Sequence, residues 1–301
     1  MSATLGELRP AMPMPPETVD VEPLFRHAGI LVTRWHCRVR EAGATATLCH
    51  QWHLIKFVHT GAFLAHLSEG TVHVDSTRAL LAAPREAYMV TRQFGPDVSG
   101  SAIAISPEVM LDIMGERDEA TTRLLGEEVT PRALLTQHLI LRQIEEDAPP
   151  LAIAELGLML AAESFRDPSA EPRLKRRSVP ARRDAVEMAQ AILAANYEKH
   201  VRLQDIARAV DVSPYHLCRE FRRVTGMRMH EYLNRLRLRA ALEQVAEPRL
   251  ALAEIAHHHG FSSQSHFAAA FRKEFLITPS EVRRLSGRTV TVIRRALGFG
   301  L

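Results

Sequence analysis

The sequence has few cysteines, few aromatic residues and no long apolar run. Its 301 residues include three cysteines, Cys37, Cys49 and Cys218, and aromatic residues make up only 6%. Such a sparse, odd set argues against a disulfide framework and favours a reducing cytoplasm. No apolar stretch approaches the roughly 18 to 20 residues that a membrane span needs. The Pro- and Met-rich start lacks the basic and apolar segments of a secretory signal. We therefore expect a globular cytoplasmic protein with no membrane partner.

The net charge of +3 conceals an asymmetry between the two halves of the chain. From Pro172 onwards there are 24 Lys and Arg against 12 Asp and Glu, which leaves 14 basic and 23 acidic residues in the first 171. A basic C-terminal half suits a polyanionic partner such as DNA, and the alternative is a solvated basic surface. An acidic N-terminal half argues against a non-specific coat on nucleic acid.

The basic half contains the same helix-turn-helix pattern twice, within residues 203–284. Each copy has a short helix with apolar residues at i, i+3 and i+4, then a turn, then a second amphipathic helix. The first helices align at a shift of 49 residues, as in Leu203/Leu252 and Ile206/Ile255. The second helices align at a shift of 50, as in Ser213/Ser263 and Phe221/Phe271. A duplication of this kind is rarely chance.

In a helix-turn-helix, the start of the second helix faces base edges in the major groove. The residues in those positions are predicted to contact bases: Tyr215, His216, Cys218 and Arg219 in the first copy, and Gln264, Ser265 and His266 in the second. The basic residues that follow are predicted to contact phosphates: Arg222, Arg223, Arg272 and Lys273. Arg219 suits guanine and Gln264 suits adenine. The alternative is that some of these are ordinary exposed side chains.

Two runs of residues carry a more specific pattern. The first extends from Ile206-Ala207 through Ser213-Pro214-Tyr215 to Phe221 and Thr225-Gly226, and the second from Ile255-Ala256 through Gly260-Phe261 to Phe271-Arg272-Lys273 and Thr278-Pro279. Over residues 203–283 the sequence resembles the DNA-binding domain of AraC/XylS-family transcriptional regulators. The resemblance implies a double helix-turn-helix domain, here placed at 181–285. It also implies double-stranded DNA as a partner.

Four positions depart from the pattern of that family. Ala269 stands where Arg is common, Leu276 where Gly is usual, Val282 where an aromatic residue is usual, and Asp211 where a small residue or Gly is common. Loss of the Arg removes a candidate contact from the second copy. We therefore expect the first copy to set most of the sequence specificity.

The N-terminal half changes from a β pattern to a helical pattern near residue 107. Short predicted strands cover 30–40, 44–50, 54–59, 62–67, 71–74, 79–82, 87–91 and 102–105, and their regular spacing suggests a small barrel or sandwich. Predicted helices follow near 109–114, 134–144 and 151–165. The last of these is apolar nearly all round, so it requires burial on several sides, against a partner subunit or within a larger domain.

The family resemblance completes the expected organisation. It implies an α+β protein, in which a cupin-like β-barrel with a helical dimerisation element is joined to the all-α DNA-binding domain. The expected divisions are a disordered lead-in at 1–23, the cupin-like effector and dimerisation domain at 24–166, a linker at 167–180, the DNA-binding domain at 181–285 and a tail at 286–301. The β domain is expected to bind a small effector and to bias the DNA-binding half.

Candidate effector contacts are aromatic and histidine side chains of the β region: Trp35, His36, His53, Phe57 and Tyr88. An organic ligand suits such a pocket. The alternatives are a metal-responsive regulator using Cys37, Cys49 and His53, whose donor types suit Zn, Cu or Ni, or a cupin-type metalloenzyme. The spacing matches no compact metal motif, and no His-x-His with a following Glu is present. We therefore predict no cofactor and no enzyme activity, but a homodimeric activator that works with RNA polymerase.

Overall fold

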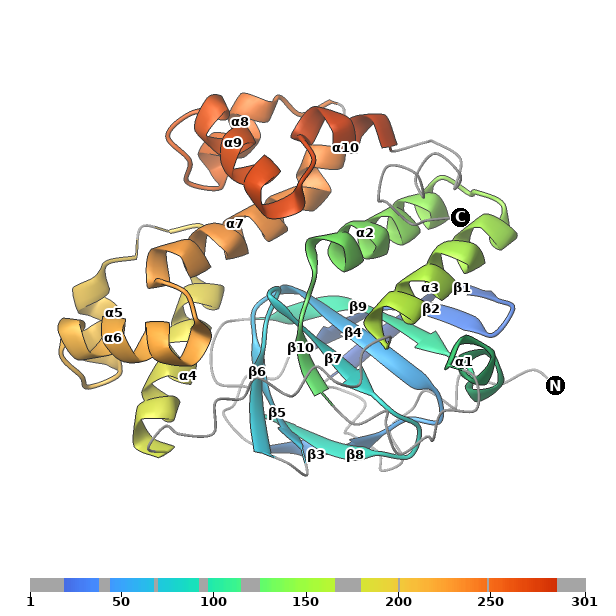
Figure 1. Cartoon of the computed structure of the whole chain (residues 1–301), viewed down its shortest axis with the longest axis horizontal. Coiled ribbons are helices and arrows are strands. Elements are labelled where there is room, and N and C mark those ends of the chain that lie inside the picture. Colours follow the sequence, from blue (N-terminus) through green and yellow to red (C-terminus); the bar gives the residue numbers. More distant parts are fainter. Residues whose placement is uncertain are drawn as a thin grey trace.

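The computed structural model describes residues 19–37, 44–67, 70–91, 97–114, 125–165, 180–199, 201–247 and 249–285. Its N-terminal part is built of β-sheets with three helices, and its C-terminal part is helical (Figure 1). The predicted mixed α and β architecture with a helical C-terminal region is thus confirmed. The predicted tail at 286–301, residues 167–179 of the predicted linker at 167–180 and the first 18 residues of the predicted lead-in lie outside the described residues.

The strands form two sheets rather than one closed barrel. The strands are β1 (Val19–His27), β2 (Ile30–Cys37), β3 (Ala44–Cys49), β4 (His53–Thr60), β5 (Phe63–Leu67), β6 (Gly70–Val74), β7 (Arg78–Ala82), β8 (Ala87–Thr91), β9 (Val98–Ile105) and β10 (Leu125–Glu128). One sheet has the order β1-β2-β9-β4-β7-β10 and the other β3-β8-β5-β6. All strand pairs among the described residues are antiparallel. The expected barrel is therefore corrected to a two-sheet arrangement, because no described strand pair joins the edges of the two sheets.

Two of these strands were not predicted. β1 begins at Val19, inside the segment expected to be a disordered lead-in, and pairs with β2 along its whole length. Its side chains are mostly exposed, so the apolar alternation that marks a buried strand is weak. β10 pairs with β7 and is only four residues long. Edge strands of this kind are held mainly by backbone hydrogen bonds, which leave little trace in the sequence.

The six-stranded sheet is buried on both faces. Side chains alternate along a strand, so Leu54 faces the four-stranded sheet and Ile55 faces the helices. One cluster, including Trp35, Phe63 and Tyr88, lies between the two sheets. A second cluster packs the other face against α1 (Pro107–Met114), α2 (Pro131–Glu145) and α3 (Pro150–Ser164).

The two longer helices of this part lie across the six-stranded sheet (Figure 1). α2 begins where Thr130 accepts a hydrogen bond from the amide of Ala133 at 3.0 Å, with Pro131 in the first turn. α3 buries one face only. Leu156 and Leu160 are fully buried, whereas Leu151 is 72% exposed. α3 is therefore apolar nearly all round because it has one buried face and, in addition, an exposed leucine at its start.

The C-terminal part consists of two three-helix units joined by a long shared helix. The helices are α4 (Pro180–Ala195), α5 (Leu203–Ala209), α6 (Pro214–Thr225), α7 (Met229–Ala246), α8 (Leu252–His258), α9 (Gln264–Phe275) and α10 (Pro279–Leu285). α7 runs between the two units in Figure 1, with α5 and α6 at one end and α8 and α9 at the other. None of the helices in the described part of the chain combines the length and apolar character required to span a bilayer.

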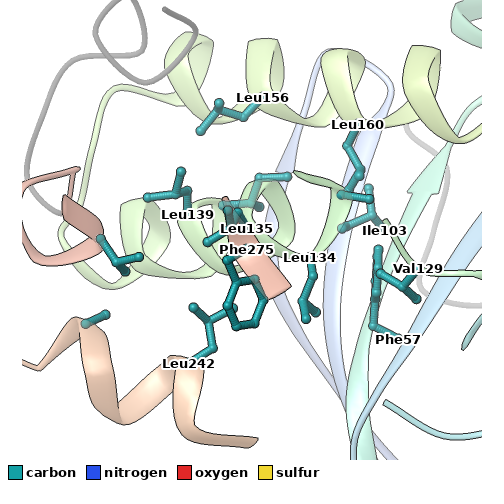
Figure 2. Close-up of a cluster of buried hydrophobic side chains, with 14 of the residues drawn as sticks. Phe57, Ile103, Val129, Leu134, Leu135, Leu139, Leu156, Leu160, Leu242 and Phe275 are labelled. Atoms are coloured by element: carbon teal, nitrogen blue, oxygen red, sulfur yellow. The ribbon is translucent and has the colours of Figure 1, made fainter. Parts of the chain in front are cut away.

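The two units have different cores. The first packs Leu217 and Phe221 of α6 against α4, α5 and the start of α7. The second shares a continuous core with the N-terminal part. Figure 2 shows Leu242 of α7 and Phe275 of α9 directed towards Leu134, Leu135 and Leu139 of α2. Full burial of one such side chain contributes about 1.5 to 3 kcal/mol, so the second unit is docked on α2 by a substantial apolar contact.

Candidate nucleic-acid interface

The first unit presents α6 as an amphipathic helix with a fixed start. Ser213 is the N-cap, and its hydroxyl accepts a hydrogen bond from the amide of His216 at 3.3 Å. Pro214 supplies the preset φ of the first helical position. Leu217, Glu220 and Phe221 are buried on one side of the helix, and its first turn is exposed on the other. This arrangement leaves the first turns of α6 accessible to a partner.

All four predicted base-contacting residues of this unit are exposed. Tyr215, His216, Cys218 and Arg219 lie on the outer surface of α6, and the rings of Tyr215 and His216 meet edge-on with centroids 5.9 Å apart. Arg222 also projects outward. Arg223 is exposed but donates from Nε to the Glu220 carboxylate at 2.9 Å, so part of its charge is already neutralised.

A concavity of about 840 Å³ lies beside this helix. Leu203 and Ile206 of α5 and Leu233 of α7 contribute apolar walls, and Arg219 and Arg222 belong to its lining. The basic residues place positive charge next to a hollow in the exposed surface of the unit. A polyanion that follows α6 would therefore meet positive charge beside this concavity.

The second unit repeats this geometry around α9. Ser263 accepts from the amide of His266 at 3.1 Å, matching the Ser213 cap of the first unit. Phe267, Phe271 and Phe275 are buried on one side of the helix. On the other side the predicted residues are exposed, namely Gln264, Ser265, His266, Arg272 and Lys273. The His266 ring contacts Phe261 edge-on at 5.4 Å, and its Nδ1 lies 3.2 Å from the Ser262 hydroxyl, so this ring is held in place.

The ends of α6 and α9 differ in strain. Gly226 ends α6 with φ +76°, and Leu276 ends α9 at the equivalent position with φ +63°. Glycine adopts this left-handed conformation at little cost, whereas a leucine does not. Leu276 is 79% exposed and gains little from packing. The departure from the family pattern at residue 276 thus leaves the backbone conformation intact and introduces local strain.

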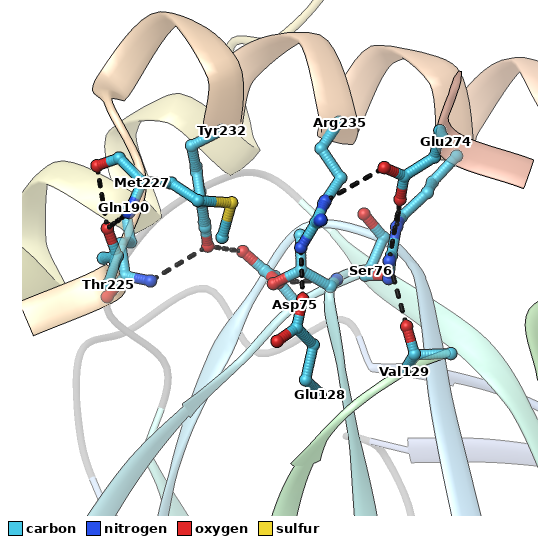
Figure 3. A network of polar contacts seen from close by, with 12 residues as sticks. Asp75, Ser76, Glu128, Val129, Gln190, Thr225, Met227, Tyr232, Arg235 and Glu274 are labelled. Carbon is cyan, nitrogen blue, oxygen red and sulfur yellow. Dashed lines mark hydrogen bonds and ion pairs between the residues drawn. The ribbon is translucent and has the colours of Figure 1, made fainter. Parts of the chain in front are cut away.

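A buried polar network joins α7 to the N-terminal part (Figure 3). The hydroxyl of Tyr232 donates to the carboxylate of Asp75, and Gln190 of α4 donates to the same hydroxyl at 3.1 Å. Burial raises the pKa of Asp75, but hydrogen bonds from His73, Thr77 and Tyr232 outweigh it, and its net pKa is lowered. Asp75 is therefore an ionised acceptor at neutral pH.

Arg239 extends this network towards the second unit. Its side chain is only 1% exposed and donates to Glu274 of α9 at 2.9 Å. It also donates to the backbone carbonyls of Ser76 and Val129, at 2.7 and 3.0 Å. Arg235 pairs with Glu274 as well, at 3.1 Å. One guanidinium therefore connects α7 and α9 with two backbone carbonyls of the N-terminal part.

Sequence reasoning missed this network. Asp75 directly follows a predicted strand, and the apolar spacing over 230–246 predicts a helix with Arg235, Arg237 and Arg239 on its outer face. The structure shows that Arg239 is buried, which corrects that expectation. A basic residue on a helix is usually solvated, so only the position of a partner domain reveals its role.

The predicted effector residues do not all share one space. Trp35 and Tyr88 belong to the core between the two sheets, whereas Phe57 packs on the helical side of the six-stranded sheet. His53 also lies apart from Trp35 and Tyr88, because its ring packs edge-on against Phe165 with the ring centroids 5.8 Å apart. His36 lies 3.7 Å from the Asp97 carboxylate. Alternation along the strands explains the separation, because neighbouring positions point to opposite faces.

The candidate metal ligands are not assembled in the described part of the chain. No group of three or more His, Cys, Asp or Glu side chains there is placed to hold a metal ion. Cys37 is associated with the core between the sheets, and His53 contacts Phe165 outside it. Cys37, Cys49 and His53 therefore do not form a common site among these residues.

Comparison with known proteins agrees with the doubled unit. Residues 206–285 match a family described as a helix-turn-helix domain. The chain is 26% identical over 232 residues to the HTH-type transcriptional regulator YbfI of Bacillus subtilis, covering 72% of this chain and 79% of YbfI. It is 29% identical over 140 residues to the transcriptional activator RhaS of Escherichia coli O157:H7, covering 46% and 49% of the two chains. It is 42% identical over 82 residues to the regulator GlxA of Rhizobium meliloti, covering 27% and 25%.

Two solved structures are similar to parts or most of the chain. An AraC-type DNA-binding domain protein of Chromobacterium violaceum is 31% identical and matches 35% of this chain and 95% of its own, with a TM-score of 0.33. ToxT of Vibrio cholerae, solved with an unsaturated fatty acid bound, is 13% identical and matches 87% of this chain and 97% of its own, with a TM-score of 0.39. The chain spans about half of RhaS and a quarter of GlxA.

Proposed function

Through residues 206–285 the chain belongs to the AraC/XylS-type helix-turn-helix regulators, and we propose that it reads DNA with α6 and α9 in a sequence-specific manner. The observation that carries this proposal is the paired exposure of the two helix starts, each fixed by a serine cap and backed by a separate buried core. Helix starts of this kind face base edges when the helix enters the major groove.

Base readout is assigned to the exposed starts of the two helices. Arg219 has the donor geometry for guanine, and Gln264 the donor and acceptor pair for adenine. Tyr215, His216, Cys218, Ser265 and His266 surround them, and Arg222, Arg223, Arg272 and Lys273 contact phosphates. The first copy is assigned the larger part of the specificity, because Ala269 lacks a polar group and His266 is already engaged with Ser262 and Phe261.

The N-terminal part is proposed to be a cupin-like effector domain with α2 and α3 as the dimerisation element. We propose that effector binding in the sheets alters the position of the DNA-binding helices. The contact between α2 and the second unit supports this coupling, because buried groups connect the sheets with α7 and α9. We further propose a cytoplasmic homodimer, without enzyme activity, that activates transcription together with RNA polymerase. The exposed Leu151 on α3 is available for such a dimer contact.

Affinity selection from a random duplex library tests the DNA-reading function, and it uses the full chain because Leu242 and Phe275 would lose their α2 contact in an isolated C-terminal fragment. We expect enrichment of two sequence blocks about 10 base pairs apart, which is one helical turn. The matched control is a variant with Arg219→Ala and Gln264→Ala, which retains the phosphate contacts and should enrich no defined motif. The proposal would be contradicted if the native chain enriched no motif, or if the control variant enriched the same motif as the native chain.

A further inference from the structure

The space between the two sheets contains a lysine that sequence reasoning did not single out. Lys56 sits in the middle of β4, between Ile55 and Phe57, which point to the helical side. Alternation therefore directs Lys56 towards the four-stranded sheet. Its Nζ lies 4.2 Å from the centroid of the Trp35 ring and 5.6 Å from that of Phe63. No carboxylate is recorded in an ion pair with this ammonium among the residues that the structure describes.

Two further polar atoms in the same region have no hydrogen-bond partner within the described part of the chain. They are the buried Nε1 of Trp35 and Nδ1 of His50. Buried groups of this kind are normally paired, and leaving one unpaired costs about 1 to 3 kcal/mol. The other nitrogen of His50 lies 2.9 Å from the Tyr88 hydroxyl. If that hydroxyl donates, the proton of the neutral imidazole resides on Nδ1, which then is also a donor.

The position of Trp35 is built into the sheet. Trp35 pairs with Gly100 of β9, and a Cβ at residue 100 would come within 2.6 Å of the indole ring. The absence of that side chain allows the indole to lie against the neighbouring strand. The ring is thereby held with its unpartnered N–H in the interior.

Charge and donor count define the chemistry that would complete this cluster. An ammonium and an indole N–H donate but do not accept, so an acceptor with negative charge is required. A single cation balances a monoanion, whereas a dianion would leave a charge uncompensated in a buried setting. Trp35, Phe63 and Tyr88 supply aromatic surface for an apolar body.

We propose that Lys56, Trp35 and His50 form the binding site for a small carboxylate with a flat apolar body, held between the two sheets. This inference rests on the proposed effector-responsive function and names the class of effector. The carboxylate would accept from the Lys56 ammonium and the Trp35 indole N–H. Tyr88 would orient His50 rather than contact the ligand.

The indole N–H signals in a nitrogen-15 NMR spectrum of the full chain provide a direct test. The chain has two tryptophans, so a Trp52→Phe variant assigns the Trp35 signal. Titration with phenylacetate should shift that signal downfield to saturation, whereas the neutral phenylacetamide should not. Lys56→Met should weaken the response at least about tenfold, and Lys199→Met, an exposed lysine, should leave it unchanged. An equal response to the amide, or an unchanged response in Lys56→Met, would overturn the site.

A second measurement needs no ligand. Burial lowers the pKa of Lys56 to about 8, so the free protein maintains an unfavourable charge between the sheets at pH 7. Lys56→Met should therefore raise the melting temperature of the ligand-free chain. A lowered melting temperature would mean that the ammonium stabilises the fold, which would also overturn the proposal.

The pH dependence gives a third readout. Phenylacetate affinity should fall as pH rises through about 8, where Lys56 loses its proton. Among the described residues, Cys37 and His50 interact electrostatically with Lys56, and Tyr88 contacts His50. Burial and the Lys56 charge lower the pKa of His50 to about 4, and burial raises the pKa of Tyr88, so both stay neutral in this range. A Cys37→Ser variant should move this fall in affinity to lower pH, because the charge of Cys37 raises the pKa of Lys56.

The results of these experiments can distinguish failure of the carboxylate site from failure of the proposed DNA-reading function. If the chain enriches a DNA motif but neither phenylacetate nor acetate shifts the Trp35 signal at millimolar concentration, the carboxylate site is wrong and the regulator remains. If the ligand binds through Lys56 but the chain enriches no DNA motif, the proposed function is wrong and the site stands.

Discussion

Replacing Arg239 with methionine tests whether the N-terminal part and the DNA-binding helices unfold as one body. The guanidinium makes hydrogen bonds to Glu274, to the Ser76 carbonyl and to the Val129 carbonyl, all between 2.7 and 3.0 Å. Methionine preserves most of the aliphatic packing and removes every one of these bonds. The variant therefore probes the polar connection with little change in buried volume.

The expected loss is about 3 to 5 kcal/mol in the free energy of unfolding, the range for removing one partner of a buried ion pair. Two backbone carbonyls lose a charged donor, and each buried unpaired acceptor costs about 1 to 3 kcal/mol. Glu274 retains Arg235 at 3.1 Å, which limits the penalty from the carboxylate. The matched control is Arg235→Met. Its second partner, Glu128, is 63% exposed, so we expect a loss of only about 1 kcal/mol.

Urea denaturation followed by two probes gives the measurement. Tryptophan fluorescence reports the sheets, because both tryptophans, Trp35 and Trp52, lie there, and far-ultraviolet circular dichroism reports mainly the helices. The two transitions should coincide in the native chain and separate in Arg239→Met, with the helical signal lost first. If Arg239→Met were no less stable than Arg235→Met, the buried guanidinium would not couple the two parts.

Two further predictions concern the DNA-binding units. Leu276→Gly should stabilise the chain by about 1 kcal/mol in thermal unfolding, because glycine adopts a positive φ at little cost. Gly226→Leu should destabilise it by a similar amount. A Cβ atom at residue 226 meets no atom within 4 Å, so only the backbone conformation matters there. Arg219→Ala should weaken binding to a selected site by about 1 to 3 kcal/mol and relax one base position. Arg222→Ala should instead weaken binding to all DNA sequences equally and reduce the salt dependence of the affinity by about one phosphate contact. If the two variants had the same sequence preference and salt dependence, the assignment of Arg219 to bases and Arg222 to phosphates would be wrong.

The DNA-binding part was predictable because its determinants are local. Ser213 and Ser263 cap their helices through amides three residues away, and the apolar residues that follow repeat at helical spacing. Local hydrogen bonds and amphipathic periodicity are written directly in the sequence. The family resemblance rests on the same residues, so the double helix-turn-helix domain could be recognised before any coordinates.

The contacts between the two parts were not predictable for the opposite reason. Asp75 and Tyr232 are 157 positions apart, and neither belongs to a motif. Lys56 shows the same limit within one sheet. From sequence alone, a lysine in an apolar strand is interpreted as a solvated edge residue, and only the position of the second sheet shows that it points between the sheets. Strand alternation would have separated Phe57 from Trp35 had the register been known, and register depends on pairing with other strands.

The docking of the second unit on α2 has a geometric consequence for DNA reading. α7 has 18 residues and is therefore a rod of about 27 Å, at 1.5 Å per residue. Its C-terminal half is embedded in the core shared with α2, and its N-terminal end, which carries α6, is attached to the N-terminal part through the Tyr232–Asp75 hydrogen bond. A tilt of about 10° at the embedded end displaces the far end by about 5 Å, roughly one and a half base-pair steps along the duplex. In the proposed DNA complex, a small rearrangement beneath α2 that also released Tyr232 from Asp75 would thus move α6 out of register with α9.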